Sequence, residues 1–308
     1  MHATTGPTRA RTSYHVAVND TNSPSVGLAL GGGTARGAAH VGVLKGMEAA
    51  GMRIDAYAGT SFGAIMAAMA ALGAPPLEIE RVVRRQNIME LWLQSVDFGL
   101  HKAALIHGER FASWLDRTIF YGARIEDAEV PLAIATTELF TGELRVLRRG
   151  SVAEAVRASC ALPGIFGSVA LEGEHLVDGG FVEPVPFRTL AELGPKRMVG
   201  VHTGLDLADS SALRRLRAMD RSLPAVALHR EARRLRGRNP WSRLVKGMSL
   251  SLRSYRNDAS APGNAEMIFT SPPIAWWDFH RSPAAIEAGQ QAFERWLETQ
   301  HAREVVAS

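Results

Sequence analysis

The residues best suited to chemistry form a Gly-x-Ser-x-Gly pattern, with Ser61 between Gly59 and Gly63. An extended run precedes the pattern at 54–58, and a run of helix-forming residues follows it at 64–72. This order predicts a tight strand-to-helix turn that exposes a serine hydroxyl, as nucleophilic catalysis requires. The two glycines let the backbone fold sharply, and the following helix presents its positive end to nearby negative charge. We therefore expect Ser61 to be a nucleophile.

A glycine loop, Gly31 to Gly37, lies upstream between an apolar strand at 26–30 and a helical run. Its bare N–H groups can approach a ligand oxygen closely, which suits two kinds of site. One is an oxyanion hole for acyl transfer. The other is a dinucleotide phosphate site, which the relaxed glycine spacing and Asp55 support. We favour the oxyanion hole, because the next strand runs directly into the Ser61 turn.

A third pattern places a carboxylate on a tight loop, where Asp178 follows a short apolar strand and precedes Gly179 and Gly180. An Asp-Gly pair alone is commonly only a turn. Here it follows the glycine loop and the serine motif in order, so we expect Asp178 to be the partner of Ser61.

These three motifs, in this order, resemble the patatin-like phospholipase family in its bacterial branch. The resemblance runs from about Val26 to Thr203, includes 135–143 and 155–166, and resumes over 268–290. It implies that Ser61 is the nucleophile and that Asp178 is its general base. It also implies an oxyanion hole and a set of supporting residues. The expected oxyanion donors are Gly32, Gly33 and Thr34, and the supporting residues are Arg36, Gly37, Gly59, Gly63, Gly179 and Gly180.

One position departs from the family pattern, because Thr34 stands where a third glycine is expected. Threonine is β-branched and tolerates a positive φ poorly. The loop must therefore hold Thr34 at a negative φ or under strain.

The resemblance implies a serine esterase of phospholipase A type that cleaves fatty-acyl esters of phospholipids or related lipids. A Ser-Asp dyad and an acyl-enzyme intermediate would carry the reaction, with no cofactor and no metal. Three alternatives stay open. The protein could be a catalytically silent lipid-binding or regulatory relative, a Ser-Asp-His hydrolase that uses His202, or a nucleotide-binding oxidoreductase. His40 and Cys160, the single cysteine, are interpreted as buried structural residues.

Strand and helix signals alternate from Val26 to about Thr203 and predict an α/β fold. We expect a three-layer patatin-like sandwich with a mainly parallel central sheet and a basic helical insertion. The expected strands are 26–30, 54–58, 131–137, 144–147, 168–171, 175–178 and 197–203. The expected helices are 37–50, 62–72, 76–86, 108–119, 151–159 and 186–194.

At 308 residues the chain can bury one substantial core. Residues 1–24 are polar and lack the apolar core of a signal peptide, so we expect a disordered tail there. Residues 25–308 are expected to form one patatin-like catalytic domain. Within it we expect a core at 25–205, a basic helical insertion or lid at 206–265, and a return to the core at 266–308.

Basic charge is concentrated in residues 211–256, which hold thirteen Lys and Arg against two acids in a chain of net charge +4. A predicted helix over 241–255 separates apolar from basic side chains, as in helices that lie on anionic membranes. A solvated lid is the other interpretation. A lipid substrate is therefore the expected partner and an anionic membrane an open one. Nucleic acid is not expected, because no binding module accompanies the charge.

The apolar stretches indicate no membrane-spanning segment, since the longest, 64–74, is far short of the ~20 residues that a bilayer requires. One cysteine excludes an intramolecular disulfide and fits a reducing compartment. We expect a cytoplasmic protein, with peripheral membrane contact left open.

Overall fold

The computed structural model describes residues 25–85, 108–162, 166–204, 265–275 and 278–307. The predicted tail and nearly all of the predicted basic insertion lie outside the described residues. The same holds for the predicted amphipathic helix at 241–255.

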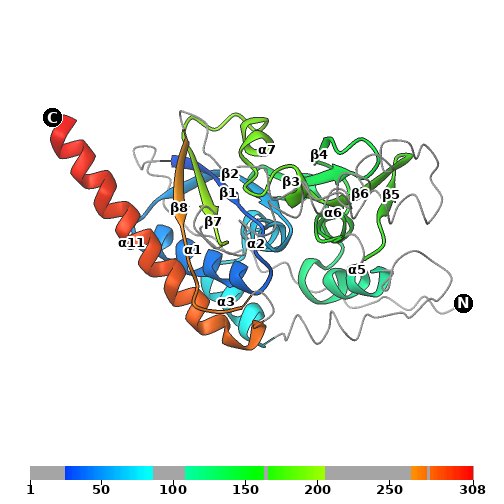
Figure 1. The fold of residues 1–308 in the computed structure, drawn as a ribbon, viewed down its shortest axis with the longest axis horizontal. Helices are drawn as coiled ribbons and strands as arrows, with labels where there is room; N and C mark the ends of the chain where they lie inside the picture. The colour runs from blue at the N-terminus through cyan, green and yellow to red at the C-terminus, as the bar shows by residue number, and fades with distance from the viewer. Residues whose placement is uncertain (1–24, 86–107, 163–165, 205–264, 276–277, 308) are drawn as a thin grey trace, which may run out of the picture.

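The described strands form a single mainly parallel sheet in the order β5-β6-β3-β2-β1-β7-β8, with β4 paired to β3 (Figure 1). The strands are β1 (Ser25–Leu30), β2 (Arg53–Thr60), β3 (Leu132–Glu138), β4 (Leu144–Leu147), β5 (Val169–Leu171), β6 (Glu174–Asp178), β7 (Met198–His202) and β8 (Ala265–Phe269). Strands β3, β2, β1, β7 and β8 run parallel to their neighbours in this series, whereas β4, β5 and β6 add antiparallel pairs at one side.

The α-helices alternate with shorter 3₁₀- and π-helical segments along the chain. The α-helices are α1 (Ala39–Ala49), α2 (Phe62–Ala71), α3 (Pro76–Arg85), α5 (Glu109–Leu115), α6 (Val152–Ser159), α7 (Phe187–Ala191) and α11 (Ser282–Ala307). The shorter segments are η1 (Thr34–Ala38), η2 (Asp116–Phe120), η3 (Ile125–Asp127), η4 (Gly179–Phe181) and η5 (Phe279–Arg281).

Successive side chains of the central strands enter two different cores, as the two-residue period of a strand requires. Leu28 and Leu30 of β1 join the larger core with α1, α2, α6 and α11, whereas Ala29 joins Phe187 and Leu190 of α7 on the opposite face. Figure 1 shows α7 on one side of the sheet and α1, α3 and α11 on the other. The predicted three-layer α/β architecture is therefore confirmed.

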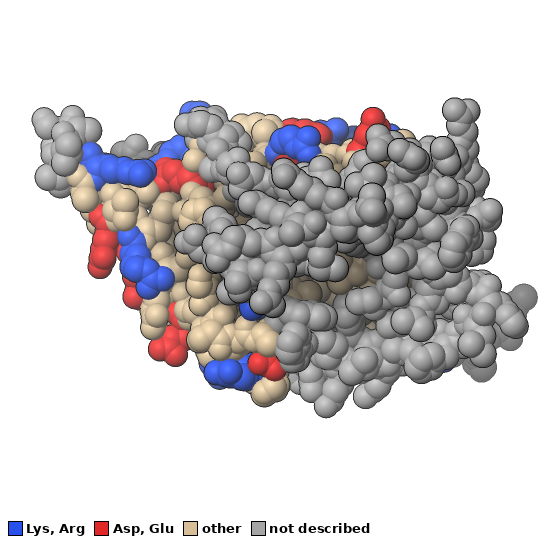
Figure 2. Space-filling view, in the orientation of Figure 1, with Lys and Arg blue, Asp and Glu red and all other residues tan. Residues whose placement is uncertain are grey.

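The C-terminal helix α11 packs along α1 and completes the larger core through Phe293 and Trp296. The indole Nε1 of Trp296 also donates a 3.1 Å hydrogen bond to Glu266 of β8. Both signs of charge are interspersed along the exposed side of this helix (Figure 2). The last described segments thus pack against the sheet and the larger core.

Candidate active site

Ser61 occupies the turn between β2 and α2 in a strained conformation, with φ 53° and ψ −125°. A positive φ is uncommon for a residue with a side chain and persists only where the surrounding structure enforces it. Ser159 contributes to that enforcement. Its hydroxyl accepts a 2.8 Å hydrogen bond from the Ser61 N–H and donates a 2.7 Å bond to the Ala135 carbonyl. Ser61 therefore lies just beyond the carboxyl end of β2.

The glycine loop lies beside this serine because α2 packs directly on the end of β1. A Cβ added to Gly63 would lie 2.1 Å from the Leu30 carbonyl oxygen, so only glycine allows this approach. A Cβ added to Gly32 would lie 3.4 Å from the Ser61 Cβ, which is an ordinary contact distance. The first two predicted motifs therefore adjoin each other in space.

Asp178 reaches the same place through the register of the sheet. Thr60 pairs with Ala135 in β3, and the next β3 residue, Thr136, pairs with Asp178 at the end of β6. Ser61 and Asp178 thus lie at one level of the sheet on the two sides of β3. The Thr137 hydroxyl donates a 2.9 Å hydrogen bond to the Asp178 carbonyl and fixes the backbone there.

The Asp178 side chain is almost completely buried, with 4% of its surface exposed. Burial raises the pKa of this carboxyl from its ordinary 3.8 to about 6, because the charged form loses water. Hydrogen bonds from the Gly180 N–H, at 2.8 Å, and from the Ser61 hydroxyl act in the opposite direction and lower the pKa. The carboxylate is therefore hydrogen-bonded to the serine and is closer in pKa to neutral pH than a free aspartate.

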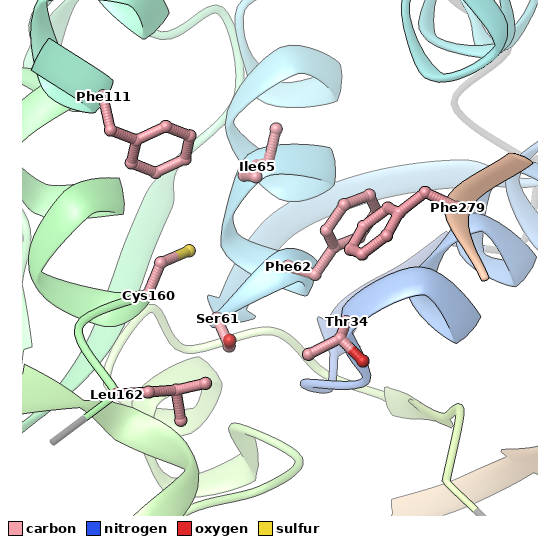
Figure 3. Close-up of a pocket in the computed structure, with 8 residues that line it drawn as sticks. All are labelled: Thr34, Ser61, Phe62, Ile65, Phe111, Cys160, Leu162 and Phe279. Atoms are coloured by element: carbon pink, nitrogen blue, oxygen red, sulfur yellow. The ribbon is translucent and has the colours of Figure 1, made fainter. Parts of the chain in front are cut away.

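Cys160 also contacts Ser61, which the sequence analysis did not anticipate. Burial and the neighbouring Asp178 charge raise the pKa of its thiol well above the usual range, so it stays protonated. Because the Asp178 carboxylate can only accept, the Ser61 hydroxyl donates to it. The thiol is buried as predicted, but it is part of the serine's immediate surroundings (Figure 3).

Hydrogen bonds from distant segments hold the glycine loop. The Gly31 N–H donates to the Val201 carbonyl and the Gly32 N–H to the Pro184 carbonyl, both at 3.0 Å. His40 Nε2 lies 2.7 Å from the Gly31 carbonyl oxygen. Burial lowers the pKa of His40 to about 4, so the ring is neutral at pH 7, and Nε2 must carry the proton that this bond needs.

These bonds correct one expectation, because the Gly32 N–H already has an acceptor and is not available to a substrate. No described residue accepts a hydrogen bond from the next amide, that of Gly33. Thr34 adopts φ 47°, so the loop holds this threonine under strain and not at a negative φ. Its hydroxyl donates a local 2.8 Å hydrogen bond to the Gly33 carbonyl.

The other motif residues hold the site together. The Arg36 Nε donates a 3.0 Å hydrogen bond to the Ile274 carbonyl and so ties the loop to the returning C-terminal segment. Gly37 packs on the ring of Phe62, and Gly59 packs on Ala64 across the serine turn. Gly179 and Gly180 form the η4 turn after Asp178.

An apolar pocket opens beside the Ser61 hydroxyl (Figure 3). Its walls come from η1, the first turns of α2, α5, the segment after α6, and η5. The lining residues are Thr34, Ser61, Phe62, Ile65, Phe111, Cys160, Leu162 and Phe279. Such a lining favours an apolar ligand group next to Ser61.

His202, the candidate for a triad, lies at the end of β7. Its ring centroid is 5.7 Å from that of Phe269. The groups that shift the pKa of Asp178 are its own burial, Gly180 and Ser61, and His202 is not one of them. The carboxyl that interacts with Ser61 is thus that of Asp178.

Comparison with known families decides the relationship, because residues 28–191, more than half of the chain, match the patatin-like phospholipase family. The chain belongs to the patatin-like phospholipase family. The predicted family is therefore confirmed.

Relatives of this patatin-like chain include bacterial and eukaryotic proteins. An uncharacterized NTE family protein of Mycobacterium bovis is 30% identical over 60% of this chain and 50% of its own length. The neuropathy target esterase of Drosophila melanogaster is 31% identical over 58% of this chain and 13% of its own length. A lysophospholipase NTE1 of Pyricularia oryzae is 31% identical over 58% of this chain and 12% of its own length. The patatin-like chain thus spans half or less of the length of these relatives.

Among solved structures, VipD of Legionella pneumophila has the same fold. The TM-score is 0.56 at 15% sequence identity, and the match covers 90% of this patatin-like chain and 67% of VipD. In the part of the chain that the structure describes, no helix combines the length and apolar character needed to cross a bilayer.

Proposed function

We propose that this patatin-like protein is a serine acyl hydrolase that releases fatty acids from lipid esters. The observation that carries the proposal is the hydrogen bond between the strained Ser61 and the buried Asp178, whose pKa is about 6. Two neighbours add to it, an amide without an acceptor among the described residues and an apolar pocket. Nucleophile, base, oxyanion donor and acyl pocket are the parts that ester hydrolysis requires.

In the proposed first step, Asp178 accepts the Ser61 hydroxyl proton while the serine oxygen attacks the ester carbonyl carbon. Negative charge develops on the carbonyl oxygen, and the Gly33 N–H, with Thr34 beside it, stabilises that charge. The carbon–oxygen bond to the lipid alcohol then breaks, and Asp178 returns the proton to the leaving alkoxide. This leaves a fatty-acyl ester on Ser61.

The second step regenerates the enzyme. Asp178 accepts a proton from a water molecule, which attacks the acyl-enzyme carbonyl, and the same amides stabilise the second oxyanion. Ser61 then leaves and recovers its proton from Asp178, and a fatty acid departs. A buried aspartate with a pKa of about 6 is a better base for both proton transfers than one at 3.8.

Two considerations indicate the substrate class. The pocket beside Ser61 is apolar and suits an acyl chain. Relatives that match this part of the chain are named lysophospholipases. We therefore propose phospholipids and lysophospholipids as the first substrates to test, with one catalytic domain over residues 25–308.

An activity-based experiment tests the proposal. A fluorophosphonate probe should label the wild type at Ser61, whereas Ser61→Ala should remain unlabelled. A screen of lipid classes should then show fatty-acid release by the wild type and losses of at least ~10³-fold in Ser61→Ala and Asp178→Asn. Circular dichroism establishes that both variants are folded.

The outcomes separate the alternatives. Lipid binding by the wild type without labelling or turnover would indicate a silent binding protein. Quenching of tryptophan fluorescence by NADPH, without labelling, would indicate a nucleotide-binding oxidoreductase. Undiminished turnover in either variant would remove the dyad.

Membrane contact by the basic segment 211–256 forms a separate proposal, since that segment lies outside the described residues. Co-sedimentation with liposomes should increase with the anionic lipid fraction and decrease with salt if the segment docks on membranes. Sedimentation that is independent of both would favour the lid.

A further inference from the structure

The hydroxyl of Thr203 makes a long-range contact with the glycine loop that the mechanism above does not use. Thr203 follows β7, its surface is fully buried, and its Oγ1 donates a 2.7 Å hydrogen bond to the carbonyl oxygen of Gly32. These residues lie 171 positions apart in the chain. The bond therefore joins the end of one parallel strand to the loop that follows its neighbour, β1.

The contact matters because of the geometry of the peptide unit that it holds. The Gly32 carbonyl and the Gly33 N–H belong to one peptide group. The described chain contains no cis peptide bonds, so these two groups point in opposite directions. Holding the carbonyl toward Thr203 therefore directs the Gly33 N–H away from Thr203. That amide is the one for which no described residue is an acceptor.

Rotation of this peptide would be harmful to catalysis. If the Gly32–Gly33 unit turned over, the Gly32 carbonyl oxygen would face the position of the developing oxyanion and repel it. The preceding unit is already fixed at both ends, by His40 on its carbonyl and by Pro184 on its N–H. The Thr203 hydroxyl supplies the corresponding restraint for the unit that carries the donor.

Gly33 and Thr203 are also matched in shape. A Cβ added to Gly33 would lie 1.9 Å from the Thr203 oxygen, which is far inside any allowed contact. Glycine at this position thus leaves the space through which the hydroxyl reaches the loop.

We propose that Thr203 is a positioning residue for the oxyanion hole, and that its hydrogen bond to the Gly32 carbonyl orients the Gly33 N–H toward the substrate oxyanion. The proposal rests on the hydrolase function given above. Thr203 acts through the loop and makes no contact with the reacting atoms. Its effect should therefore be on the transition state and not on ground-state binding of the lipid.

Two substitutions test the role of the hydroxyl. Thr203→Val keeps the shape and removes the donor, whereas Thr203→Ser keeps the donor. Loss of an oxyanion donor costs ~10²–10³-fold in rate, and misorientation of a donor that remains present should cost less. We expect kcat to fall about 10- to 100-fold in Thr203→Val with KM within about threefold, and Thr203→Ser to retain most of the wild-type kcat.

Thr270→Val is the matched control. Thr270 is also buried, and its hydroxyl donates a 3.2 Å hydrogen bond to the His202 carbonyl. This substitution removes a buried hydroxyl beside the same strand end without touching the glycine loop. We expect Thr270→Val to keep kcat within about threefold of wild type, since the site is unchanged.

Inhibitor binding gives a readout that general destabilisation would not produce. A lipid trifluoromethyl ketone forms a tetrahedral adduct with Ser61 that places an oxyanion in the hole. A non-hydrolysable ether lipid binds as a ground state only. In Thr203→Val the affinity for the ketone should fall by the same factor as kcat/KM. The affinity for the ether lipid should equal that of the wild type.

The possible results are distinguishable. Equal kcat and equal ketone affinity in wild type and Thr203→Val would overturn the role of Thr203 and leave the hydrolase function intact. Equal losses in Thr203→Val and Thr270→Val would also overturn it, as a packing effect. A wild type without turnover would refute the hydrolase function itself. If Thr203→Val does not fold, Thr203→Cys, which retains a weaker donor, should give a kcat between those of Thr203→Ser and Ser61→Ala.

Discussion

Ser61 and Asp178 are joined by a hydrogen bond between their side chains, although β3 lies between the strands that deliver them. The serine follows the last residue of a strand parallel to β3, and the aspartate ends a strand antiparallel to it. Their register places both at one level of the sheet. The contact between Ser61 and Asp178 therefore depends on the register of three strands, β2, β3 and β6, and not on residues that are close in sequence.

The pKa of Asp178 predicts how activity varies with pH. The carboxyl must be ionised to accept the serine proton, and its pKa is raised by burial to about 6. We expect kcat/KM to rise tenfold per pH unit below pH 6 and to level off above it. The measurement uses an ester that does not titrate between pH 4.5 and 8.

His202→Ala serves as the control for that profile, because a histidine could titrate in the same range. The variant should keep the same midpoint. A profile that is flat down to pH 4.5 in the wild type would contradict the assignment of Asp178 as the base.

Asp178→Asn should stabilise the fold at neutral pH while it abolishes activity. The folded pKa lies above the unfolded one, so the stabilising contribution of the protonated carboxyl is lost as the pH rises through about 6. Raising the pKa from 3.8 to about 6 corresponds to about 3 kcal/mol of folding stability that is lost when the buried carboxyl ionises. Asparagine carries no charge and does not incur this loss. Denaturant unfolding should show the variant to be more stable at pH 8, with a smaller difference at pH 5.

A wild type more stable than Asp178→Asn at pH 8 would contradict this prediction. Ser61→Ala is a suitable comparison, since it alters the same site without changing a charge. Its stability relative to wild type should depend much less on pH.

Phe111 should limit the length of the acyl chain. Its buried ring forms part of the pocket beside Ser61. Phe111→Leu should enlarge that space and shift the optimum of kcat/KM toward longer acyl chains, changing the long-to-short preference about tenfold. A series of esters of one alcohol with acyl chains of increasing length measures this preference.

Phe120→Leu provides the control, because Phe120 is buried in the same core but does not line the pocket. It should leave the chain-length preference unchanged. An unchanged preference in Phe111→Leu would place the acyl chain elsewhere.

His202→Ala should retain turnover within about threefold of wild type, because Asp178 draws its hydrogen bonds from Ser61 and Gly180. The measurement compares kcat with that of Asp178→Asn. A loss of kcat as large as that of Asp178→Asn would indicate a Ser-Asp-His triad that includes His202.

Much of the fold was predictable from sequence, because its signals are local. The predicted strands at 26–30 and 131–137 correspond to β1 and β3. The helix expected from residue 37 begins as a 3₁₀ segment at Thr34, where the left-handed threonine and the tied glycines prevent a regular first turn.

The site was predictable only in part. Ser61 and Asp178 stand in glycine motifs, so their positions could be inferred. Ser159 and Thr203 act through hydroxyls that bond to backbone groups far away in the chain. Such bonds require a small polar residue at one point in space and leave no periodicity or spacing to detect. The hydrogen bond from the Gly32 N–H to the Pro184 carbonyl likewise could not be predicted from the sequence.

The restraints on the glycine loop have a consequence for biogenesis. Val201, Thr203 and Ile274 hold the loop, yet a ribosome synthesises all three long after Ser61. A nascent chain that has emerged only as far as β6 already carries Ser61 and Asp178, the proposed nucleophile and base, but not the residues that restrain the proposed oxyanion donor. If the proposed hydrolase function holds, folding intermediates should therefore be poor catalysts, and full activity should arise only once the whole polypeptide has folded.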